Sequence, residues 1–98
     1  MKAEHISIAQ RLEDVPHIGP QVASLLRDVG IQHPTQLKDK EALWLYNKIC
    51  RVTLRTHSPL LLDRLLAAID FSAGHAPEPL GTFRAERERL LRIGADEI

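Results

Sequence analysis

Apolar residues recur at three- and four-residue spacing along most of this chain, and no segment alternates apolar and polar residues as a half-buried strand would. This periodicity predicts an all-α fold, a compact bundle of five to six short helices. The expected helices cover residues 7–14, 20–29, 34–38, roughly 13 residues after Asp39, 59–73, and a last segment from residue 82 onward.

Capping residues and helix breakers set the expected ends of these helices. Ser7, Asp39, Ser58 and Thr82 are residue types whose side chains accept hydrogen bonds from the free N–H groups of a first helical turn. The stretch 74–81 holds two glycines and two prolines, so no helix continues through it. The side chains expected in the core are Ile8, Leu12, Val15, Val22, Leu25, Leu26, Val29, Leu37, Leu43, Tyr46 or Trp44, Ile49, Cys50, Val52, Leu61, Leu62, Leu65, Leu66, Ala68, Ile69, Phe83, Leu90, Leu91 and Ile93.

The most specific local pattern is Val-Pro-His-Ile-Gly-Pro-Gln-Val-Ala, at residues 15–23. Pro16 disfavours helix at the residue before it, and Pro20 suits the first position of a new helix, where its missing N–H costs nothing. Gly19 can take a positive φ, or it can let a phosphate approach the backbone closely. Gly30 stands where a left-handed residue commonly ends a helix. The pattern predicts a helix, a short hairpin and a second helix.

This segment resembles the helix-hairpin-helix motif, in which an apolar residue, Pro, Gly, an apolar residue and Gly precede Pro or a basic residue and then Ala. The resemblance implies a SAM-like or helix-hairpin-helix architecture and a module that binds DNA without reading its sequence. In that family, backbone N–H groups at the start of the second helix hold a phosphate, as free N–H groups at a helix start can. The corresponding residues here are His17, Ile18, Gly19, Gln21 and Val22. A monovalent cation on hairpin carbonyl groups often assists in the family, and the resemblance implies no other cofactor.

Two residues depart from the motif at the expected phosphate site. His17 replaces the first glycine, and its side chain either contacts phosphate when protonated or shields the turn. Gln21 replaces the common lysine and removes a positive charge. These departures favour an alternative, a protein–protein interaction domain of the same fold whose hairpin no longer binds phosphate. An exposed apolar patch on the face with Trp44 would support that alternative.

The chain beyond the hairpin resembles a small bacterial family whose members are labelled "pathogenicity locus" or "mitomycin resistance" helix-hairpin-helix proteins. The matching residues are Leu45-Tyr46, Ile49-Cys50, Ser58 to Asp63 and Ala67-Ala68. That family often has a cysteine after the proline, where Leu60 stands here. A more distant resemblance is to the C-terminal domain of bacterial competence regulators of the TfoX type. These labels name a genetic context and add little chemistry.

Length and composition indicate one small domain. We expect a domain over residues 1–74, a Pro/Gly loop over 75–81, and a C-terminal helix over 82–98 that packs on or extends the same domain. Thirteen basic residues balance thirteen acidic ones, without the basic excess of a strong nucleic-acid binder. A single cysteine, no apolar run near the roughly 18 residues of a membrane span, and no signal peptide predict a soluble cytoplasmic protein. The oligomeric state stays open.

Basic residues gather in the middle of the chain. Lys48, Arg51 and Arg55 stand at three- and four-residue spacing and would share one helix face. One interpretation is a strip beside the hairpin that faces phosphates and binds them with salt-dependent affinity; the other is an ordinary solvated helix face. The connection at residues 55–59 lacks glycine, and it is a candidate for a degenerate second hairpin that only packs.

No group of residues predicts catalysis or a metal site. The five histidines fall in five separate segments, whereas zinc ligands usually come in closely spaced pairs. Cys50 is interpreted as a core residue on an apolar helix face. Asp63 and Asp70, seven residues apart on one helix, are interpreted as surface carboxylates. The sequence therefore predicts no catalytic residues, no metal ligands and no enzyme.

Overall fold

The computed structural model describes the backbone of residues 2–96 and the side chains of residues 2–92. Within that part of the chain the only regular elements are α-helices and short 3₁₀ turns, so the all-α prediction is confirmed. The helices are α1 (Pro20–Asp28), α2 (Ala42–Thr53), α3 (Pro59–Ser72) and α4 (Arg84–Asp96). The 3₁₀ turns are η1 (Ile6–Ile8), η2 (Leu12–Asp14), η3 (Pro34–Leu37) and η4 (Leu80–Phe83).

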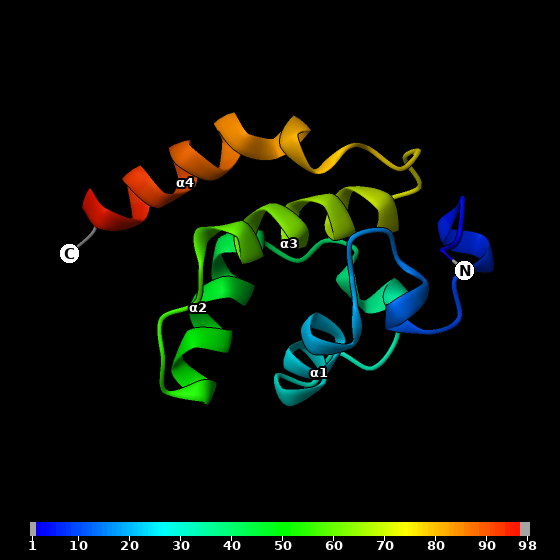
Figure 1. Ribbon diagram of the computed structural model, residues 1–98, viewed down its shortest axis with the longest axis horizontal. Coiled ribbons are helices and arrows are strands. Elements are labelled where there is room, and N and C mark those ends of the chain that lie inside the picture. Colours follow the sequence, from blue (N-terminus) through cyan, green and yellow to red (C-terminus); the bar gives the residue numbers. More distant parts are fainter. Residues whose placement is uncertain (1, 97–98) are drawn as a thin grey trace.

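Helix α3 lies at the centre of the molecule. It contacts α2, η3, η4 and α4, and after the 74–79 loop the chain reverses so that α4 runs back along α3 (Figure 1). Leu62, Leu65 and Ala68 on α3 are fully buried, and they join one core with Leu12, Val15, Ile18, Ala23, Leu26, Leu37, Leu45, Ile49 and Phe71. No helix within residues 2–96 is long and apolar enough to cross a membrane.

The helix expected over residues 7–14 is wrong, because the chain makes the two separate turns η1 and η2 there. The carboxylate of Asp14 accepts the N–H groups of Gln10 and Arg11 at 3.0 and 2.9 Å, which holds the backbone in a cap at Arg11 and prevents a continuous helix. Ile8, expected in the core, is therefore 61% exposed, while Leu12 and Val15 are fully buried as expected.

Helix α2 begins later than predicted and is rotated relative to its expected face. Glu41 and not Asp39 precedes its first turn, and Asp39 itself has a φ of 69°. The buried positions are Ala42, Leu45, Tyr46 and Ile49, which follow helical spacing. Of the alternatives Tyr46 and Trp44, Tyr46 is the buried one and Trp44 is exposed, and Val52, an expected core residue, is exposed as well.

The C-terminal segment is attached to α3 by an ion pair. Arg87 Nε lies 3.1 Å from Asp63 Oδ1, and both side chains are largely buried, although the two groups are not aligned as a hydrogen bond. The interpretation of Asp63 as a surface carboxylate is therefore wrong, because its neutralising partner comes from a helix more than twenty residues away. Thr82 lies inside η4 and does not cap α4, and the expected inward side chain of Ile93 lies outside the described residues.

Candidate functional site

Residues 15–19 form the turn that joins η2 to α1, hereafter the 15–19 turn. The side chains of Val15 and Ile18 are fully buried, and the Ile18 N–H donates to the Val15 carbonyl at 3.1 Å. The left-handed residue is His17, with a φ of 70°, and not Gly19, whose φ is −91°. Histidine tolerates this conformation better than most non-glycine residues. His17 stands where the motif has its first glycine. Comparison with the motif could therefore have indicated that this residue takes a positive φ.

The start of α1 presents free backbone N–H groups. Gly19 gives no side-chain cap, and its carbonyl accepts the Ala23 N–H at 2.9 Å. Among the described residues, the N–H groups of Gly19, Gln21 and Val22 donate to no acceptor. No atom outside its chain neighbours lies within 4 Å of the position that a Cβ would occupy at Gly19. Free N–H groups at an accessible helix start attract anions.

The imidazole of His17 is held by a distant loop. Its Nε2–H donates to the Glu78 carbonyl at 2.7 Å, so the ring joins the 15–19 turn to the segment that leads into α4. Ile18, one of the predicted site residues, offers neither a free N–H nor an accessible side chain. Of the five predicted site residues, Ile18 is therefore the one that the fold withdraws from a ligand.

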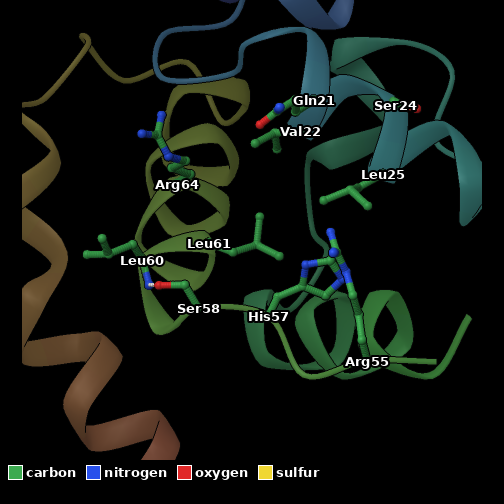
Figure 2. A pocket seen from close by; sticks show the side chains of 10 residues that line it. All are labelled: Gln21, Val22, Ser24, Leu25, Arg55, His57, Ser58, Leu60, Leu61 and Arg64. Carbon is green, nitrogen blue, oxygen red and sulfur yellow. Dashed lines mark hydrogen bonds between the residues drawn. The ribbon is translucent and has the colours of Figure 1, made fainter. Parts of the chain in front are cut away.

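A pocket of about 500 Å³ lies between α1 and the start of α3, and we call it the α1–α3 pocket. Val22, Leu25 and Leu61 form its apolar interior, with Arg64 and Gln21 toward one end and Arg55 and His57 toward the other (Figure 2). Its lining comprises Gln21, Val22, Ser24, Leu25, Arg55, His57, Ser58, Leu60, Leu61 and Arg64. Two arginines and no carboxylate belong to this lining, so the pocket suits an anionic ligand.

Arg64 joins the pocket to the 15–19 turn. Its Nη1–H donates to the His17 carbonyl at 2.9 Å, and the residue is only partly exposed. Sequence reasoning missed Arg64, because the contact spans 47 positions and an arginine on an apolar helix carries no local signal of it.

His57 lies in a hydrogen-bonded cluster that holds the turn between α2 and α3. The Thr53 hydroxyl donates to the Ile49 carbonyl at 2.7 Å, so its oxygen accepts the His57 Nε2–H at 2.8 Å. The Tyr46 hydroxyl donates to the His57 carbonyl. Burial, with a smaller contribution from the nearby Arg55 charge, lowers the pKa of His57 below its ordinary value. At neutral pH the imidazole therefore adds no charge to the pocket.

The expected basic strip is divided in the structure. Lys48 lies over the Trp44 ring, 4.8 Å from its centroid, and Arg51 is exposed on α2. Leu54 ends the helix with a φ of 58°, so Arg55 leaves the helix and lines the α1–α3 pocket instead. The prediction that the three residues share a helix face is wrong, because the helix ends before the third. No group of three or more His, Cys, Asp or Glu side chains converges in a manner suited to a metal ion within the described residues.

Comparison with known proteins identifies the family of this chain. The family model described as Cdd1, pathogenicity locus, matches residues 5–89. The chain belongs to the pathogenicity locus family. It is 30% identical to mitomycin resistance protein McrB from Streptomyces lavendulae over 80 residues. These aligned residues cover 82% of this chain and 76% of that protein. No solved structure matches the chain. The more distant resemblance to the TfoX C-terminal domain stays a prediction.

Proposed function

We propose that this protein binds the phosphate backbone of DNA without reading its sequence. In this proposal η2, the 15–19 turn and α1 act as a helix-hairpin-helix unit, and a phosphate oxygen accepts hydrogen bonds from the N–H groups of Gly19, Gln21 and Val22. The observation that carries the proposal is the group of three free N–H groups at the accessible start of α1. The partial positive charge of a helix start favours an anion at this place.

Arg55 and Arg64 supply the charge that the motif position Gln21 lacks. Both line the α1–α3 pocket, which continues from the start of α1 through Gln21 and Val22. A DNA strand whose one phosphate lies at Gly19 would place a neighbouring phosphate toward these arginines. Each such contact releases counterions from the DNA, so affinity should fall steeply with added salt. The charge is local, which is compatible with a net charge of zero for the whole chain.

The test is fluorescence anisotropy with labelled single- and double-stranded DNA across a salt series. Arg55→Ala should weaken binding several-fold and lower the slope of log affinity against log salt by about one. Arg51→Ala is the matched control, since Arg51 is an exposed arginine outside the pocket, and it should leave affinity nearly unchanged. No binding at low salt, where non-specific binding should be tighter than the roughly 10⁻⁴–10⁻⁶ M typical of physiological salt, would overturn the proposal.

A protein–protein interaction domain is the second candidate, and the Trp44 groove supports it. Trp44 is 48% exposed beside a cavity of about 480 Å³ between α2, α3 and α4. Its lining holds Glu41 and Glu86 and no basic residue, so its chemistry is opposite to that of the α1–α3 pocket. A photo-crosslinking amino acid at position 44 should capture a partner, while the same group at Val52, which is 49% exposed, should not. Equal capture from both positions would reject this candidate.

A further inference from the structure

Most carbonyl groups of the 15–19 turn, and those of Glu13 and Asp14 just before it, accept internal donors. The Lys2 ammonium donates to the Glu13 carbonyl at 2.7 Å and also to the Ile18 carbonyl. The Ala3 N–H donates to the Asp14 carbonyl at 2.7 Å, which pairs the N-terminal segment with η2. One acceptor of Lys2 lies in η2 and the other near the end of the 15–19 turn, so a single side chain connects the two segments.

Two further carbonyl groups of the turn have donors of their own. The Val15 carbonyl accepts the Ile18 N–H, and the His17 carbonyl accepts Arg64 Nη1–H at 2.9 Å. A free metal cation at Glu13 and Ile18 would have to displace an ammonium group that already supplies one positive charge and up to three N–H donors. The residues present therefore do not fit the monovalent cation that the motif resemblance implies.

Lys2 also acts on one of the free N–H groups. The Ile18 carbonyl and the Gly19 N–H belong to the same peptide group, so a cation on that oxygen polarises the group and makes the N–H a stronger donor. Burial is the largest influence on the Lys2 ammonium and lowers its pKa, and the Arg64 charge acts in the same direction. The nearby carboxylates of Asp14 and Glu13 oppose this shift and favour the charged form. The ammonium is thus held by two backbone carbonyl groups, those of Glu13 and Ile18.

We propose that the Lys2 ammonium is a tethered substitute for a free monovalent cation, so that the 15–19 turn folds and presents its N–H groups without bound Na⁺ or K⁺. The proposal concerns the turn and stands whether or not DNA is the ligand. Where DNA is bound, as proposed above, Lys2 is a positioning residue that strengthens the Gly19 N–H without touching the phosphate.

The test compares thermal unfolding in potassium chloride and in N-methylglucamine chloride at equal ionic strength, since the organic cation is too large for the turn. The chain should carry any affinity tag at its C-terminus, so that nothing is added next to Lys2. The wild-type Tm should be the same in both salts. Lys2→Met should have a lower Tm in N-methylglucamine chloride, and potassium should raise it by roughly 3 °C or more by binding to the vacated carbonyls.

Lys40→Met is the matched control, because Lys40 is exposed and it should behave as wild type in both salts. A wild-type Tm that rises with potassium, or a Lys2→Met Tm that does not, would overturn the proposal. If Lys2→Met does not fold in either salt, the wild-type amide resonance of Gly19 decides. This resonance should not shift when potassium is added. A saturable shift would mean that potassium binds the wild-type turn, and it would refute the proposal that Lys2 replaces the cation.

The DNA-binding assay separates this proposal from the proposed function. Lys2→Met should lose several-fold affinity in N-methylglucamine chloride and regain part of it in potassium chloride, while wild type shows no such difference. If no DNA is bound in any salt, the proposed function fails, and the unfolding comparison still decides the role of Lys2.

Discussion

Helices α1 and α3 both start with a proline, yet their first turns differ. Gly19-Pro20 opens α1 with no side-chain cap and leaves the Gln21 N–H free among the described residues. Ser58-Pro59 opens α3, where the Ser58 hydroxyl accepts the Leu60 N–H at 3.2 Å. The Ser58 carbonyl accepts the next N–H, that of Leu61, at 3.0 Å. The residue at the cap position thus distinguishes a helix start without a side-chain acceptor from one whose first N–H groups are already accepted.

The two preceding turns are also held in opposite ways. The 15–19 turn is held through the Ile18 and His17 carbonyl groups, by Lys2 and Arg64, and the Gly19 N–H at its end has no acceptor among the described residues. The turn before α3 is held through His57, whose backbone N–H lies 3.5 Å from Cys50 Sγ. The His57 ring donates to the Thr53 hydroxyl, and the His57 carbonyl accepts the Tyr46 hydroxyl. Internal contacts thus occupy the carbonyl groups of the turn before α1, whereas they occupy the N–H, ring and carbonyl of His57 before α3.

The largest expected difference between the two turns concerns core packing. Ile18→Ala should lower the free energy of unfolding by about 2–5 kcal/mol, because Ile18 is fully buried and its removal leaves a cavity. Leu60→Ala, at a residue 54% exposed at the start of α3, should change it by less than about 0.5 kcal/mol. Chemical denaturation measures both, and equal losses would contradict the assignment of Ile18 to the core.

The next effect concerns the cap of α3. Ser58→Ala should lower the free energy of unfolding by about 1 kcal/mol, because the Leu60 N–H loses its acceptor. The same denaturation experiment measures it. A loss below about 0.3 kcal/mol would mean that water replaces the hydroxyl without cost and that the two helix starts are energetically alike.

A serine at position 19 should give α1 the kind of side-chain cap that Ser58 gives α3. Gly19→Ser should change stability by only a few tenths of a kcal/mol, since glycine and serine are both good capping residues and open space surrounds Gly19. Its hydroxyl should occupy the Gln21 N–H and weaken DNA binding several-fold in the anisotropy assay. Unchanged affinity in this variant would show that the free N–H groups do not bind phosphate.

A lysine at position 21 should add a positive charge beside the free N–H groups at the start of α1. Gln21→Lys should strengthen DNA binding a few-fold and raise the salt slope by about one contact. Gln32→Lys is the control, since it adds the same charge at an exposed residue beyond the other end of α1. If both variants gain equally, the effect is general attraction and not a site at Gly19.

The smallest expected effect is a pH dependence that arises at the turn before α3. Because the pKa of His57 is lowered in the folded protein, the unfolded chain binds a proton first as pH falls. The stability linked to His57 should be complete above about pH 6.5 and decline below it. Comparing unfolding midpoints of wild type and His57→Gln from pH 8 to pH 5 measures it, and identical pH profiles would contradict the assignment.

Strong local signals predicted much of this fold. The confirmed features are the all-α class, α1 with the left-handed Gly30 after it, α3 with its Ser58 cap, and the end of α3 at the left-handed Gly74. These were predictable because proline at a first helical position, glycine after a last one and a serine cap act over a few residues. The N-terminal helix failed because the Asp14 side chain competes with the helix for two backbone N–H groups.

The sequence by itself determined where the helices α1 and α3 begin, and it pointed to Gly19, Gln21 and Val22 as backbone donors. Only the tertiary structure decided which distant groups surround them. Lys2, Arg64 and Glu78 reach the 15–19 turn from 16, 47 and 61 positions away, and Arg55 reaches the pocket because the helix before it ends. Helical spacing describes neighbours within a few residues, whereas these contacts depend on how α1, α3 and the loop before α4 pack together.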